Sequence, residues 1–79
     1  MTLQLLDVVV LNVDQPAHGL KRGDLGAVVN VQGSDAFDVE FVTASGRTKA
    51  VITLRADDVR PAEDDDLLAV RRVSSPADV

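Results

Sequence analysis

The residues most suited to acid–base chemistry lie in one polar segment, Asp14 to Asp24. This segment holds His18, the only histidine of the chain. An imidazole can act as a general base when a nucleophile and an orienting carboxylate lie beside it. Because the chain has no cysteine and no second histidine, the pattern gives a catalytic role for His18 little support. We expect a loop histidine beside a turn glycine, Gly19.

Two groups of carboxylates also invite a functional interpretation. Asp24 precedes a Leu-Gly pair, where a short acidic side chain typically accepts backbone N–H bonds in a turn. The run Glu63–Asp66 is wholly acidic, but calcium loops place their ligands at alternate positions around a turn glycine, which this run lacks. A solvated acidic linker or a helix start is the expectation here. We therefore expect no catalytic residue, no metal and no cofactor, and predict that the chain is not an enzyme.

Four basic residues make the case for nucleic-acid binding: Lys21, Arg22, Arg47 and Lys49. They lie on segments that can converge in a small barrel. The chain has no Trp or Tyr to stack on bases, and both phenylalanines fit a core. The 13 acidic and 8 basic residues give a net charge of −5, which opposes a phosphate backbone. The composition therefore argues against nucleic acid and favours a basic protein partner.

Short β-strands must position these side chains, because β-branched runs and turn residues alternate through the first 61 residues. The pattern predicts strands over 5–13, 25–32, 36–43 and 48–54, a 3₁₀ turn over 56–59 and a short final strand at 60–61. A chain of 79 residues forms one domain at most. The strand spacing predicts an all-β fold, a small five-stranded SH3-like barrel.

Two segments of this predicted fold carry further candidate residues. In 36–43, Asp38 and Glu40 alternate with two phenylalanines and a valine, so one strand face is buried and the other is wet. Lys49 is expected across the ladder, near one of these carboxylates.

Leu20 is the one large apolar residue of the loop 14–24 and is expected to anchor that loop to the core. Gly26 is expected to mark a bulge or a tight bend.

The composition changes after residue 61, so we divide the chain into a barrel, 1–61, and an acidic linker with a short amphipathic tail, 62–79. Acids before Leu67 and two arginines before Val73 match a helix dipole, although a strand fits nearly as well. Residues 74–79 are expected to be frayed. The aliphatic side chains of the tail either close the open end of the barrel or dock on a partner.

Several motifs together resemble a family: Leu6-Asp7-Val8-Val9, His18-Gly19-Leu20, Lys21-Arg22-Gly23-Asp24-Leu25-Gly26 and Val39-Glu40-Phe41. Over about residues 3–61 the chain resembles a widespread family of small bacterial proteins known as a domain of unknown function. The resemblance implies an SH3-like barrel, and the Gly-Asp-x-Gly-x-Val element is also similar to the KOW motif of ribosomal and transcription proteins. It implies no catalytic residues. Some family members are encoded beside toxin-like or nuclease-like proteins, which implies an interaction or neutralising role.

These observations predict a non-enzymatic protein-binding module, a partner or neutralising protein for a toxin- or nuclease-like protein. The alternatives are a KOW-like RNA- or ribosome-associated module and a structural homo-oligomer with exposed sheet edges. No secretory signal and no membrane-spanning run is visible, so a cytoplasmic protein is expected. The expected binding surface combines loop, sheet and tail residues: His18, Leu20, Lys21, Arg22, Asp38, Glu40, Leu67, Leu68 and Val70.

Overall fold

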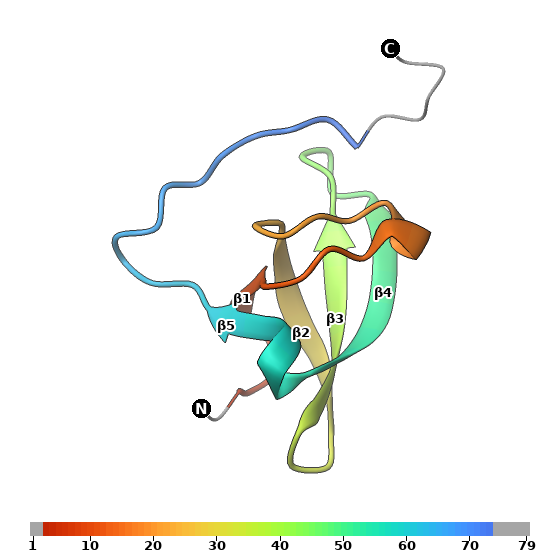
Figure 1. Cartoon of the computed structure of the whole chain (residues 1–79), viewed down its shortest axis with the longest axis vertical. Coiled ribbons are helices and arrows are strands. Elements are labelled where there is room, and N and C mark those ends of the chain that lie inside the picture. The colour runs from red at the N-terminus through yellow and green to blue at the C-terminus, as the bar shows by residue number, and fades with distance from the viewer. Residues whose placement is uncertain (1–2, 74–79) are drawn as a thin grey trace.

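Five antiparallel strands form one sheet, and each is rich in the β-branched and aromatic residues that fit a pleated, half-buried surface (Figure 1). The computed structural model describes residues 3–73. The strands are β1 (Val8–Leu11), β2 (Leu25–Gln32), β3 (Ala36–Val42), β4 (Thr48–Arg55) and β5 (Val59–Pro61), with 3₁₀ helices η1 (Pro16–His18) and η2 (Ala56–Asp58). The frayed terminus predicted for 74–79 lies outside the described residues. None of the described helices has the length and apolarity needed to cross a membrane.

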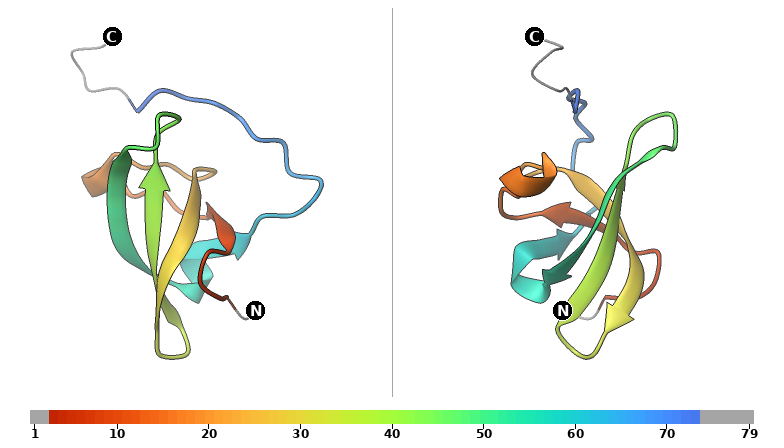
Figure 2. Two further views of the ribbon diagram at one scale, coloured as in Figure 1. Left: turned by 180° about the vertical axis from the view of Figure 1, so that it is seen from behind. Right: turned by 90° about the vertical axis from the view of Figure 1, so that its right-hand side faces the viewer.

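The strand order is β4-β3-β2-β1-β5. β2, β3 and β4 form a long meander, and the short β1–β5 pair runs across its direction, as the right-hand view of Figure 2 shows. The predicted all-β, five-stranded fold is confirmed. Within residues 3–73, however, β4 and β5 are the two edges of the sheet and no ladder joins them, so the sheet is not closed into the expected barrel. We call residues 8–61 the β-domain.

The core lies on the inner face of the curved sheet and is built from aliphatic side chains and two phenylalanines. On β3, Phe37, Val39 and Phe41 are buried, while the two acidic residues between them point away, as the alternation predicts. Leu20 is 3% exposed and belongs to the same core cluster, so its predicted anchoring role is confirmed.

Gly26 allows β2 to pass close to the core side chains of β3. A Cβ at this position would lie 2.5 Å from Cγ1 of Val39 and 2.9 Å from Cε2 of Phe41. The predicted bulge is displaced, because the register shift in β2 falls between Val28 and Asn30. The glycine therefore serves close packing across the sheet rather than a bend at its own position.

The first strand is shorter than predicted because a turn precedes it. The backbone N–H of Gln4 donates to Oδ2 of Asp7 at 2.8 Å, and the N–H of Asp7 donates back to the Gln4 carbonyl at 3.1 Å. Leu6, inside this turn, has a φ of 70° and is exposed. The apolar run 5–13 thus supplies only its middle, Val8–Leu11, to the sheet.

Residues 62–73, which we call the tail, contain neither a helix nor a strand. The predicted helix and its strand alternative over 67–73 are both absent. An apolar run this short does not hold an isolated helix in water, and the tail pairs with neither edge strand. The tail instead runs as an open arc from β5 toward the loop 14–24 (Figure 1).

Candidate functional site

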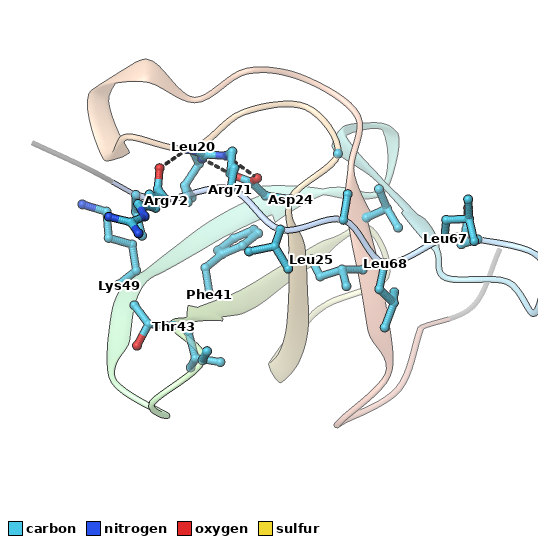
Figure 3. Close-up of a pocket in the computed structure, with 18 of the residues that line it drawn as sticks. Leu20, Asp24, Leu25, Phe41, Thr43, Lys49, Leu67, Leu68, Arg71 and Arg72 are labelled. Carbon is cyan, nitrogen blue, oxygen red and sulfur yellow. Dashed lines mark hydrogen bonds and ion pairs between the residues drawn. The ribbon is translucent and has the colours of Figure 1, made fainter. Parts of the chain in front are cut away.

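A groove of about 730 Å³ lies between the tail and one end of the β-domain. Its floor comes from the sheet and the loop, with apolar side chains that include Leu20, Leu25, Phe41 and Val42. The tail forms the opposite wall from Asp66 to Val73. In Figure 3, Phe41 and Leu25 lie on the sheet side, and Arg71 and Asp24 are joined by dashed lines. We call this cavity the tail groove.

An ion pair between Arg71 and Asp24 holds the far end of the tail. Arg71 Nε donates to Oδ1 of Asp24 at 2.8 Å, and Nη2 donates to Oδ2 at 2.5 Å. The same Nη2 also donates to the Gly19 carbonyl at 3.1 Å. The two side chains are 34% and 16% exposed, respectively. This bidentate geometry fixes the guanidinium plane against the loop, and we call it the latch.

Asp24 is held in place by its own turn. Its Oδ2 accepts the backbone N–H of Lys21 at 2.8 Å, and its N–H donates to the Lys21 carbonyl at 3.0 Å. This is the turn role that the sequence predicts for Asp24. Burial raises the pKa of the carboxyl group, but the hydrogen bonds and charge of Arg71 and the Lys21 N–H outweigh it, so the pKa of Asp24 is lowered. The carboxylate is thus charged and oriented by the loop itself.

A second ion pair holds the near end of the tail. Arg60 Nη1 and Nη2 donate to the two carboxylate oxygens of Asp66 at 2.8 and 2.7 Å. Asp66 also accepts the Glu63 N–H at 2.7 Å. The Arg60 hydrogen bonds, followed by this backbone bond, lower the pKa of Asp66 to about 2. One member of the acidic run thus has a structural role, and we call this pair the hinge.

The aliphatic side chains of the tail stay outside the core. Leu67 is 95% exposed, Leu68 is 72% exposed and Val70 is 97% exposed. The first of the two sequence interpretations, in which these residues close an open end of the β-domain, is therefore wrong. The tail is fixed by charged groups at its two ends, while its apolar side chains face solvent or the groove.

The predicted surface falls into two separate parts. Leu20 and Lys21 lie at the groove and at the cavity beside it, close to the tail. His18 is exposed in η1 and lines neither cavity. The Arg22 side chain is exposed, and its backbone N–H donates to Oδ1 of Asp14 at 2.8 Å, which stabilises the loop.

Asp38 and Glu40 lie on the outer face of the sheet, so the structure does not bring loop, sheet and tail residues together into one surface. Asp38 accepts hydrogen bonds from Thr53, Gln32 and Asn30, which lower its pKa in that order of effect. Thr48 donates to Glu40 at 2.6 Å.

The prediction that Lys49 lies near one of these carboxylates is wrong. Its Nζ lies against the loop, where it would be 3.4 Å from a Cβ on Gly19. The side chain therefore points toward the end of the sheet that carries the loop.

The cavity beside the groove, about 390 Å³, is lined by basic residues. Lys21 and Lys49 meet there with Arg71 and Arg72 of the tail, and Asp14 also contributes. Arg22 and Arg47, the other two members of the predicted basic patch, do not line it. Two of the four residues predicted for the basic patch, Lys21 and Lys49, thus lie together. The other two basic residues of this cavity come from the tail, where the sequence pattern predicted the end of a helix.

Within residues 3–73, no group of three or more His, Cys, Asp or Glu side chains is arranged to hold a metal ion. The latch and the hinge are the features that sequence reasoning missed. Asp24 and Arg71 are separated by 47 positions, and no motif or spacing relates them. The hinge spans only six positions, but its arginine lies in β5 and its acid belongs to a run of four acidic residues, so the sequence does not indicate which carboxylate pairs with Arg60.

The fold and the groove define a small all-β domain with an appended, charge-tethered tail. The family described as "Domain of unknown function (DUF4926)" matches residues 5–61, which is most of the chain, and the protein belongs to this family. The match ends at the last residue of β5, so the tail lies beyond it. Searches of curated proteins and of solved structures found no match.

Proposed function

We propose that this protein is a non-enzymatic protein-binding module whose binding surface is the tail groove together with the tail side chains Leu67, Leu68 and Val70. One observation carries the proposal. Three aliphatic side chains are exposed on a segment that two ion pairs hold beside a groove with an apolar floor. The fold gains little from these side chains, whereas a partner that covers them removes apolar surface from water.

The energetics favour a contact site. Fully burying an aliphatic side chain of this size contributes about 1.5–3 kcal/mol, so a few such residues suffice as the anchors of an interface. Because the hinge already restrains the near end of the tail backbone, less conformational entropy is lost when a partner binds. The groove floor adds Leu25 and Phe41 to the same surface.

The charge of the protein indicates the kind of partner. A net charge of −5 steers a basic protein toward this domain and raises the association rate. A basic, cytoplasmic toxin- or nuclease-like protein fits this chemistry, and binding of the acidic domain to it would neutralise it. The acidic run of the tail, Glu63–Asp66, lies next to the proposed anchors and contributes to this steering.

Co-purification from the native host tests the proposal. The wild-type protein should recover a basic partner, and a variant with Leu68→Ser and Val70→Ser should lose it. Val51→Ser is the matched control, because Val51 is an exposed aliphatic residue of β4 that does not line the groove. Equal recovery by all three proteins, or recovery of none, would contradict the proposal.

A second candidate, a KOW-like RNA-binding module, is favoured by the cavity where Lys21, Lys49 and Arg72 gather. Binding of a short single-stranded RNA measured over a salt series decides it. Affinity that falls steeply with salt and depends on Lys49 supports this candidate, and no binding at low salt removes it. Self-association in light scattering would instead support the homo-oligomer, whose contacts would use the exposed edges of β4 or β5.

A further inference from the structure

We propose that Asp24 and the Gly19 carbonyl form an arginine-binding site, which Arg71 occupies in cis and which an arginine of the partner protein takes over. The ligand is an extended protein segment in which aliphatic residues precede the arginine, as they do in the tail. This inference rests on the proposed function and specifies the chemistry of its partner.

The acceptors of this site belong entirely to the loop. Both Asp24 oxygens and the Gly19 carbonyl receive the guanidinium, and the Lys21 backbone N–H orients the carboxylate. Because none of these groups comes from the tail, they are present whether or not the tail is in place. Nε and Nη2 of one guanidinium reach all three acceptors, whereas a lysine ammonium cannot reproduce the bidentate contact.

The cis occupant binds weakly enough to be displaced. The tail buries neither Leu67 nor Val70, so the latch is its main contact beyond Asp66. A tether of this length gives Arg71 an effective concentration on the order of millimolar. A partner segment that brings an arginine and also fills the apolar groove therefore competes successfully.

The charges around the site permit this exchange. In the latched state, the basic cavity holds Arg71 and Arg72 in addition to the two lysines. When the tail leaves, both arginines leave with it, and Lys21 and Lys49 then face Asp14 and Asp24 in equal number. The arginine of the partner thus replaces the positive charge of Arg71 beside Asp24.

The hinge keeps the displaced tail close to the groove. Arg60 holds Asp66 through two hydrogen bonds that do not involve the latch. Leu68 and Val70 therefore stay within a few residues of a fixed point and can close over the bound segment. This arrangement assigns the latch to partner recognition and the hinge to retention of the tail.

The test uses the full chain and a fluorescent peptide with the sequence of residues 66–73 as the probe, with anisotropy as the readout. Arg71→Ala empties the site and should bind the probe about tenfold or more tightly than wild type, whose own Arg71 competes. Adding Asp24→Asn to Arg71→Ala should reduce probe affinity about tenfold or more. Adding Asp35→Asn instead changes the charge equally at an exposed pair far from the groove and should have no effect.

Circular dichroism spectra confirm that each variant is folded. A probe carrying Arg71→Lys should bind about tenfold more weakly than the parent probe. Equal probe binding by wild type and Arg71→Ala, or an unchanged affinity in the Asp24→Asn variant, overturns the inference. Self-association of wild type that Asp24→Asn abolishes also overturns it, because the occupant would then be a second copy. The probe assay needs no partner, so its failure is distinguishable from a failure of the co-purification.

Discussion

The guanidinium of Arg71 makes a bidentate contact with the carboxylate of Asp24, 47 positions earlier in the chain, with Nε 2.8 Å from Oδ1. This pair joins the end of the tail to a loop of the β-domain. Beyond Asp66, the other hydrogen bond between the tail and the β-domain in the described part of the chain is made by the same guanidinium to Gly19. The position of the tail is therefore set by a charged contact, and its aliphatic residues are available for other contacts.

Removing the latch should free the tail without unfolding the β-domain. In Arg71→Ala, we expect the ¹⁵N–¹H heteronuclear NOE of Ala69 and Val70 to fall, while the strands keep their values. The free energy of unfolding should change by about 0–1 kcal/mol, because a partly exposed ion pair contributes little. Arg72→Ala is the control, since Arg72 makes no ion pair within residues 3–73. An unchanged NOE in Arg71→Ala would show that other contacts hold the tail.

Acid should release the tail at a pH below the usual carboxyl range. The pKa values of Asp24 and Asp66 are lowered in the folded protein, and that of Asp66 lies at about 2. The stabilisation from a carboxyl group with a depressed pKa is fully present above its unfolded value, about 4, and is lost as the pH falls through its folded value. Carboxyl ¹³C shifts should show Asp66 titrating near pH 2 and Asp24 titrating below its unfolded value. Titration of either group at or above pH 4 would contradict the described ion pairs.

Gly26→Ala should destabilise the β-domain by about 1–3 kcal/mol, because the new Cβ would overlap with Val39 and Phe41 in the core. Urea denaturation measures the change. Gly46→Ala is the comparison, because its Cβ would meet no atom within 4 Å and its cost comes from a φ of +87°. A loss in Gly26→Ala no larger than the loss in Gly46→Ala would show that β2 can move away from β3 at this point.

Substitution of the outer-face carboxylates should leave partner binding intact. Asp38→Asn and Glu40→Gln alter a network of neutral donors on the face of the sheet that points away from the core and the groove. Isothermal titration of the recovered partner should give the wild-type affinity for both variants. A marked loss of affinity would place the partner on the outer face of the sheet instead of at the tail.

The strands follow from local patterns, and the sequence therefore predicts them well. β2 has the predicted bounds, and β3 and β4 differ by one residue at one end, because alternation and turn residues specify them locally. Leu20 is recognisable because it is the only large apolar residue in a polar loop. The N-terminal boundary predicted for β1 is wrong because the Gln4–Asp7 turn depends on a side-chain hydrogen bond that the apolar pattern does not reveal.

The candidate site was less predictable. The sequence singles out Leu67, Leu68 and Val70 as candidate binding residues, but it does not predict their exposure, which depends on the carboxylates that Arg60 and Arg71 bind. The position of Lys49 beside Gly19 was not predicted either, because it depends on the path of the loop across the end of the sheet. Such contacts join distant segments and leave no periodic signal in the sequence.

The most direct test asks whether the tail side chains serve a partner or the fold. Urea denaturation should compare wild type with a variant carrying Leu67→Ser, Leu68→Ser and Val70→Ser. Leu11→Ala calibrates the assay, because Leu11 is fully buried in the core and its truncation should cost about 2–5 kcal/mol. We predict that the free energy of unfolding of the triple variant lies within about 0.5 kcal/mol of the wild-type value. A loss of about 2 kcal/mol or more would show that these side chains pack on the β-domain, and it would contradict their assignment to a partner.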